Sequence, residues 1–240
     1  MKLFLTGDLI TPIAFYRWKG KWYEAILHGE NYGLGYDLSG KPYIFNVDDI
    51  EAFDLFRSQI NRYLSFMNFY DIPYLKRQKA FNNIDLRCSL AIHLYLKRSI
   101  EDNNSFIIFD KLIDYTIALE SLYLNEKEKG KGEKLSRRIS TLLSKDDSEK
   151  GRINEDIKYF YEIRGDIVHA SLIDQKGEDF LSKNICKYEN ILRKSILAFL
   201  DLNLSYKTKK DVLSQLDQAI SNPEMREKIH DSLEILKLAR

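Results

Sequence analysis

The nine residues Tyr161-Glu-Ile-Arg-Gly-Asp-Ile-Val-His169 lie in a stretch, from about 154 to 170, whose apolar spacing predicts an α-helix. Arg164 and His169 stand five positions apart within it. They combine a permanent cation with the one side chain whose unperturbed pKa lies near neutrality. Such a pair can move a proton and stabilise a developing negative charge on a phosphate without a metal.

Helical periodicity continues on both sides of this stretch and predicts an all-α helical bundle for most of the chain. A charged, glycine-bearing segment at 125–134 predicts a loop between two of the helices. The predicted helices cover about 48–64, 84–100, 105–122, 135–143, 154–170 and 179–204, and two shorter helices follow, the last beginning at Ser221-Asn-Pro223.

The first 46 residues differ from the rest, because they hold six of the eleven glycines and short aromatic runs. Two of these runs, 14–18 and 22–27, flank Lys19-Gly-Lys21, which predicts a β-hairpin connection. The segment is too short to form a hydrophobic core of its own. The sequence therefore predicts a small β-rich N-terminal segment at 1–46 and a helical domain at 47–240 that includes a C-terminal helical extension.

The overall charge balance is nearly neutral, with 37 Lys and Arg against 36 Asp and Glu. This balance argues against coating of nucleic acid by the whole surface and leaves a local basic face open. Cys88 and Cys186 are isolated, which suits a reducing compartment. No apolar run reaches the ~20 residues of a membrane span, and the start has too few apolar residues for a signal peptide. We expect a soluble, cytoplasmic protein with no membrane partner.

Three segments, in this order, resemble the HEPN superfamily and, within it, the ApeA-like HEPN group. Asp114–Leu124 is similar to that group's helix with an Ala-Leu-Glu-x-Leu core, and Lys134–Leu143 is similar to the helix that follows. Tyr161–His169 matches the signature Tyr-x-x-Arg-x-x-x-Val-His. The resemblance extends over the order of features from about 84 to 200, which is about half of the chain, and the first 46 residues lie outside the match.

The resemblance implies a helical bundle that forms a homodimer and brings two copies of the motif together. It implies that Arg164 and His169 form the catalytic pair of a metal-independent endoribonuclease without a cofactor. Such proteins act on RNA, for example tRNA or mRNA, as toxins or anti-phage defence effectors, and an antitoxin or regulatory protein can be a partner. The alternative is a non-catalytic module that binds RNA, a nucleotide or a regulatory protein. Gly165 favours this alternative slightly, because a polar residue often follows the arginine in the superfamily.

The chemistry of RNA fits these two residues. RNA carries its own nucleophile, the 2′-hydroxyl, so a nuclease needs only to move protons and stabilise the phosphate. His169 can accept the 2′-hydroxyl proton or, as imidazolium, protonate the leaving 5′-oxygen. Arg164 can hold the non-bridging oxygens with its planar donor fork. The products would then carry a 2′,3′-cyclic phosphate, and no divalent ion would be needed.

Helix geometry separates the two catalytic candidates. Five residues at about 100° each place His169 roughly 140° around an ideal helix from Arg164. Either Gly165 allows a local bend, or each side chain meets a partner from a second chain. The second explanation agrees with the dimer that the resemblance implies.

Several further residues are candidate supporting groups. Tyr161 shares a helix face with Arg164 and can orient it or pack in the core, and Glu120 is either the acid that holds Arg164 or a buried structural partner. Asp166 contributes either polarity at the site or a solvated face. The candidate RNA-binding residues are Lys131, Lys134, Arg137 and Arg138, for which a solvated face is the competing interpretation.

A third interpretation is purely structural. The chain would then be a dimerisation domain whose N-terminal strands recruit a partner by pairing at a sheet edge. In that case the 161–169 motif would be dispensable.

Overall fold

The computed structural model describes most of the chain from residue 105 onward and a few segments before it. The two helices predicted at 48–64 and 84–100 fall largely outside this part, as does most of the segment 1–46. The positions described between 88 and 98 are helical. The described residues are 13–18, 21–26, 88, 90–92, 94, 95, 98, 105–169, 173–206 and 208–238.

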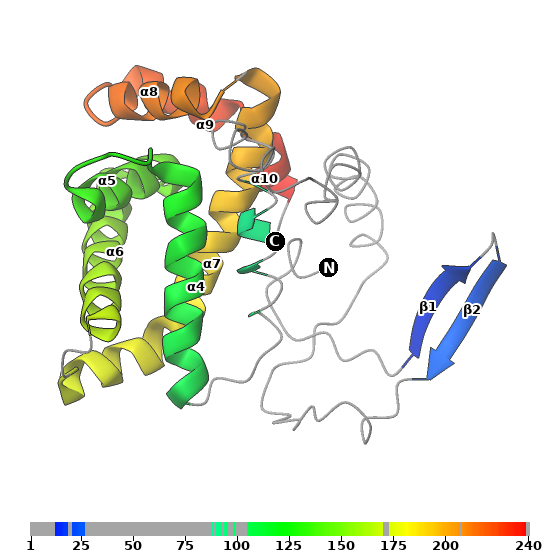
Figure 1. Cartoon of the computed structure of the whole chain (residues 1–240). Helices are drawn as coiled ribbons and strands as arrows, with labels where there is room; N and C mark the ends of the chain where they lie inside the picture. The colour runs from blue at the N-terminus through cyan, green and yellow to red at the C-terminus, as the bar shows by residue number, and fades with distance from the viewer. Residues whose placement is uncertain are drawn as a thin grey trace.

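The described chain from residue 105 is helical, which confirms the all-α prediction for this part (Figure 1). The helices are α4 (Ser105–Tyr123), α5 (Lys131–Leu143), α6 (Asp147–Val168), α7 (Gln175–Ser205), α8 (Lys209–Ala219), α9 (Pro223–Asp231) and α10 (Glu234–Leu238).

A β-hairpin lies at the position where the sequence predicts one. Strand β1 (Ile13–Trp18) pairs antiparallel with β2 (Lys21–Ile26), and the register places Trp18 opposite Lys21. The hairpin is the described part of the segment 1–46, so the wider β-rich prediction lies outside the described residues.

Helices α4 to α7 share one hydrophobic core. Leu119 of α4, Ile139 of α5, Phe160 of α6 and Leu192 of α7 are all completely buried. The ring of Phe160 stacks on that of Tyr188, with centroids 4.2 Å apart and planes at 26°. Burial of each such side chain contributes about 1.5–3 kcal/mol. The core therefore fixes α6, which carries the motif, against α4 and α7.

Side-chain caps explain where the helices begin. Asp146 accepts a hydrogen bond from the Glu149 backbone N–H at 2.8 Å, so α6 starts one turn or more before the predicted residue 154. Asp174 caps α7 in the same way. Asn222 caps α9, which begins at Pro223, where the sequence predicts a helix start.

Helix α5 begins inside the segment predicted as a loop. Gly130 precedes it with φ of 64°, in the left-handed region that glycine occupies without strain. The charged stretch 125–134 is therefore a loop only up to residue 130, and Lys131 already belongs to the helix.

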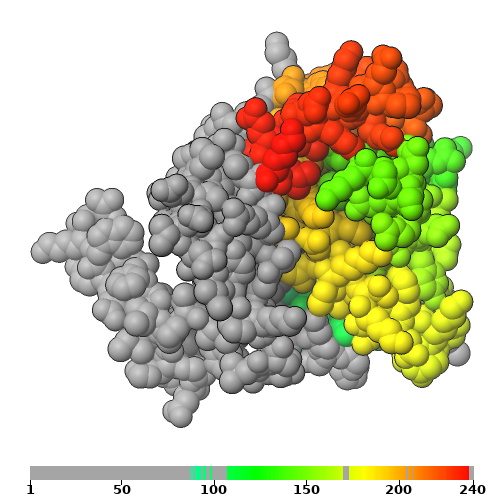
Figure 2. All heavy atoms as spheres, turned by 180° about the vertical axis from the view of Figure 1, so that it is seen from behind, coloured from blue at the N-terminus to red at the C-terminus, as the bar shows by residue number. Residues whose placement is uncertain are grey.

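Three short helices follow α7, whereas two were predicted. The additional helix, α10, is held by the buried carboxylate of Asp201, which accepts from the backbone N–H groups of Ile235 at 2.9 Å and Leu236 at 3.1 Å. Figure 2 shows these C-terminal helices, in orange and red, closing over the end of the bundle.

Candidate functional site

The motif lies at the C-terminal end of α6. The helix continues through Gly165 to Val168, and the His169 backbone N–H donates to the Gly165 carbonyl at 3.0 Å. Gly165 therefore does not interrupt the helix, and it provides no break that would bring Arg164 and His169 onto one face. Nothing lies within 4 Å of the position that a Cβ at Gly165 would occupy.

Arg164 and His169 differ in exposure. Arg164 is partly buried, and its Nε is shielded from solvent but has no hydrogen-bond acceptor among the described residues. His169 is exposed at the helix end. In the described part of the chain no hydrogen bond or ion pair joins the two side chains. The structure thus places both residues at the C-terminal end of α6.

Tyr161 connects the motif helix to α4. Its hydroxyl donates to Oε1 of Glu120 at 2.8 Å. Burial, the hydrogen bond to Glu120 and the charge of that carboxylate raise the pKa of Tyr161 to about 12, while the nearby charge of Arg164 lowers it. Arg164 is therefore close enough to act electrostatically on the same pair.

Glu120 does not hold Arg164 directly. Its carboxylate accepts from Tyr161, and among the described residues it forms no ion pair with Arg164. The arginine is left with a buried donor that the protein does not satisfy. Of the two interpretations of Glu120, the structural partner is the one that the hydrogen bond supports.

Gly132 is a residue that sequence reasoning missed. It lies in the first turn of α5, and a Cβ at this position would come within 2.9 Å of Cδ1 and 3.3 Å of Cε1 of the Tyr161 ring. The missing side chain lets the ring lie directly against α5. The signal in the sequence was Gly132 itself, the second glycine after Gly130. Two glycines so close together are also typical of a loop, so the signal was not distinctive.

Asp166 is exposed, and the structure assigns it no contact with Arg164 or His169. The predicted basic residues of α5 divide into exposed and buried groups. Lys131 is exposed, Lys134 pairs with Glu128 at 3.3 Å, and Arg137 pairs with Glu133 at 2.6 Å.

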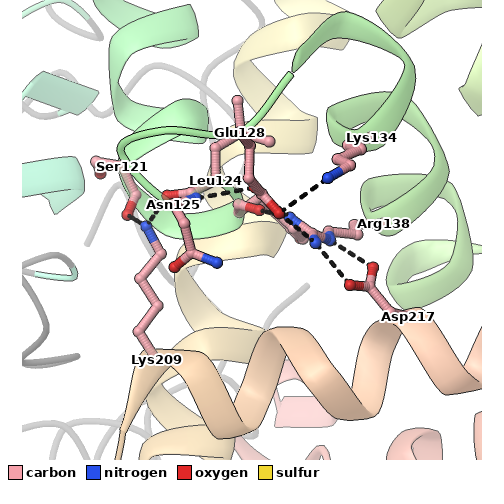
Figure 3. A network of polar contacts seen from close by, with 9 residues as sticks. Ser121, Leu124, Asn125, Glu128, Lys134, Arg138, Lys209 and Asp217 are labelled. Carbon is pink, nitrogen blue, oxygen red and sulfur yellow. Dashed lines mark hydrogen bonds and ion pairs between the residues drawn. The ribbon is translucent and has the colours of Figure 1, made fainter. Parts of the chain in front are cut away.

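Arg138 was predicted to bind RNA, and the structure corrects this. The residue is 1% exposed, and its guanidinium is fully engaged inside the protein (Figure 3). Nη1 and Nη2 donate to the two carboxylate oxygens of Glu128 at 2.8 and 2.9 Å, and Nε and Nη2 donate to both oxygens of Asp217 at 2.7 Å. A side chain so held cannot reach an external phosphate.

The two carboxylates compensate for burial of the Arg138 charge. Burial alone would raise the pKa of Glu128, but hydrogen bonds from Arg138 and from the Asn125 backbone outweigh it and hold this pKa at about 2. Removing either partner of such a buried pair leaves an uncompensated charge. Arg138 is thus a structural residue that joins α5 to the 124–130 loop and to α8.

The C-terminal end of α4 receives two cations. Arg138 donates to the Tyr123 carbonyl at 2.7 Å, and the buried Nζ of Lys209 donates to the carbonyls of Ser121 and Leu124 (Figure 3). Carbonyls in the last turn of a helix have no partners within the helix, and positive charge is favourable there. Helix α8 therefore stabilises α4 through Lys209.

A sequence signal for the role of Arg138 did exist. Leu135, Ile139 and Leu142 form the buried stripe of α5, and Arg138 lies on the same stripe. A charged residue at a core position indicates a buried ion pair. The partner Asp217 could not be found from the sequence, because it lies 79 residues further along the chain.

Comparisons of the chain with protein-family models, with curated proteins and with solved structures found no match. None of the helices in the described residues combines the length and apolar character that crossing a membrane requires. In the same part of the chain, no three His, Cys, Asp or Glu side chains are arranged to hold a metal ion.

Proposed function

We propose that this protein is a HEPN-type, metal-independent endoribonuclease that acts as a homodimer on cytoplasmic RNA such as tRNA or mRNA, as a toxin or anti-phage defence effector. The observation that carries the proposal is the state of Arg164. Its Nε is buried without an acceptor among the described residues, and it stands five residues before an exposed histidine. A buried donor without an acceptor costs about 1–3 kcal/mol, and a bound phosphate oxygen would satisfy it.

The proposed roles follow from the exposure of the two side chains. His169, in contact with solvent, exchanges protons with the 2′-hydroxyl or the leaving 5′-oxygen. Arg164 supplies positive charge where the phosphate becomes more negative. Tyr161, fixed by Glu120, limits the freedom of the neighbouring arginine, since it lies three residues earlier on the same face.

A second copy of the chain would complete the site. Five positions separate Arg164 from His169, which is roughly 140° around an ideal helix, so we infer that one substrate phosphate meets both groups only if the second comes from another chain. Val168, next to His169, is 47% exposed, and contact with a second copy would remove this apolar side chain from water. The proposed assembly has two copies of α6 meeting at this end.

The test is cleavage of total cellular RNA in excess EDTA by the wild type, His169→Ala and, as a control, His230→Ala. His230 lies on α9 and its ring contacts the Thr141 carbonyl at 3.1 Å, far from the motif in sequence. Cleavage by the wild type and the control alone, with 2′,3′-cyclic phosphate ends, would support the nuclease. Cleavage that EDTA abolishes would contradict it. RNA binding without cleavage would favour the non-catalytic module.

A further inference from the structure

The segment 126–138 holds six basic and three acidic residues, and the structure separates its charges into two groups. Lys134, Arg137 and Arg138 are paired with carboxylates, namely those of Glu128, Glu133 and Asp217. The lysines at 127, 129 and 131 are exposed and form no ion pair in the described part of the chain. We call these three residues the α5 lysine patch, since Lys131 begins α5 and the other two lie just before it. Glu126, also exposed, offsets one of its three charges.

The patch adjoins the motif helix. Gly132, the residue after Lys131, lies directly against the Tyr161 ring, and Lys158 of α6 pairs with Glu133 at 2.7 Å. Arg164 follows Tyr161 by three residues, a rise of about 4.5 Å along the helix. A polyanion bound at the patch would therefore reach the end of α6 within a short distance.

The local backbone adds to the positive potential. Helix α5 begins immediately after Gly130, and no side chain caps its first amide groups. The N-terminus of a helix carries a partial positive charge, which has the same sign as the lysines.

We propose that the α5 lysine patch binds the phosphate backbone of the RNA and directs it along α5 to the end of α6. This inference rests on the proposed function for the identity of the ligand. Of the RNA-binding residues predicted from the sequence, the inference keeps only Lys131. It adds Lys127 and Lys129 as contacts to the RNA backbone in place of Lys134, Arg137 and Arg138. The contacts are independent of base sequence, because lysine reads a phosphate as a point charge.

The test uses the full chain with His169→Ala, so that the RNA stays intact. Binding of a short, labelled single-stranded RNA of mixed sequence is measured over a range of salt concentrations. Three chains are compared: this parent, a patch variant (Lys127→Gln, Lys129→Gln and Lys131→Gln) and a control variant (Lys183→Gln, Lys210→Gln and Lys228→Gln). The control removes the same number of exposed lysines from α7, α8 and α9.

Neutralising three phosphate contacts on single-stranded RNA should reduce the slope of log K against log salt by about 2, and the affinity at low salt should fall on the order of tenfold to a hundredfold. The control variant should bind like the parent. Equal losses in both variants, an unchanged slope in the patch variant, or no RNA binding by the parent would each overturn the proposal.

Binding and cleavage separate this inference from the proposed function. If the wild type cuts RNA but the patch variant keeps the parent's salt slope, only the patch assignment fails. If the patch variant shows the reduced slope of log K against log salt but the wild type never cuts RNA, the patch assignment stands and the proposed nuclease activity fails.

Discussion

The hydroxyl of Tyr161 donates to Oε1 of Glu120 across 2.8 Å, and this bond links the motif helix α6 to α4. Because the acceptor is a carboxylate, the bond is stronger than one between neutral groups. The same tyrosine ring lies against Gly132 of α5. One side chain thus sets the position of three helices around the motif.

Removing that hydroxyl tests the link. We expect Tyr161→Phe to lower the free energy of unfolding by roughly 1–2 kcal/mol, since the carboxylate of Glu120 loses its donor in a partly buried place. Urea unfolding measures the change. The matched control is Tyr159→Phe, because the Tyr159 ring contacts Phe180 while its hydroxyl makes no hydrogen bond with the described residues. Equal losses in the two variants would count against the link.

Gly132→Ala should be destabilising even though alanine favours helices. The new methyl group would meet the Tyr161 ring at 2.9 Å, and we expect a loss of about 1–2 kcal/mol. Gly151→Ala on α6 is the control, because nothing lies within 4 Å of its Cβ position. That variant should gain about 0.5–1 kcal/mol. A gain in both variants, measured by urea unfolding, would show that the ring and the glycine are not in contact.

Gly165→Ala tests whether the proposed site needs a glycine at this position of the motif. The position is helical and open, so we expect a gain of about 0.5–1 kcal/mol in stability. If the proposed nuclease needs only a continuous helix here, RNA cleavage by this variant stays at the wild-type rate. A stable variant that has lost cleavage would mean that substrate or the second chain approaches the backbone at Gly165.

The free energy of unfolding should fall in acid because Glu128 becomes protonated. Its folded pKa of about 2 lies below the ordinary glutamate pKa of 4.5, so its contribution is complete above about pH 4.5 and disappears as the pH falls toward 2. Between about pH 6 and 3 the loss should be roughly 2 kcal/mol. Urea unfolding of the wild type and Glu128→Gln at both pH values measures it. The variant should start less stable and lose less on acidification; identical pH dependence in both would contradict the assignment.

Lys209→Met should weaken the end of α4. The substitution keeps the length of the side chain but leaves the Ser121 and Leu124 carbonyls without their donor, and we expect a loss of roughly 3 kcal/mol. Lys210→Met, at the exposed neighbouring position, should change the stability by less than about 0.5 kcal/mol. Thermal and urea unfolding compare the two, and similar losses would show that Lys209 has no special role.

The sequence predicted the helices of the core well, because apolar residues such as Ile157 and Phe160 repeat at helical spacing and dominate the energy of burial. Helix starts were less accurate. Asp146 capping α6 and Gly130 preceding α5 are local features that also occur in loops.

The candidate site was predictable only in part. The positions of Arg164 and His169 on one helix end follow from the sequence, since they are local. The pairing of Glu120 with Tyr161 and of Arg138 with Asp217 does not, because each joins residues far apart in the chain. The helical spacing of Arg138 with Leu135 and Ile139 indicates burial but does not identify its partners, so the surface that remains for RNA could be defined only after the internal ion pairs were known.

The bidentate contact between Arg138 and Asp217 has a consequence for where this folding unit ends. A chain shortened after α7 would lose Asp217 and Lys209 together, exposing the guanidinium side of α5 and the carbonyl end of α4 at the same time. Helices α8 to α10 should therefore exchange their amide hydrogens and resist proteases in step with α4 and α5. Homologous sequences, where they exist, should keep or lose the charges at positions 138 and 217 as a pair.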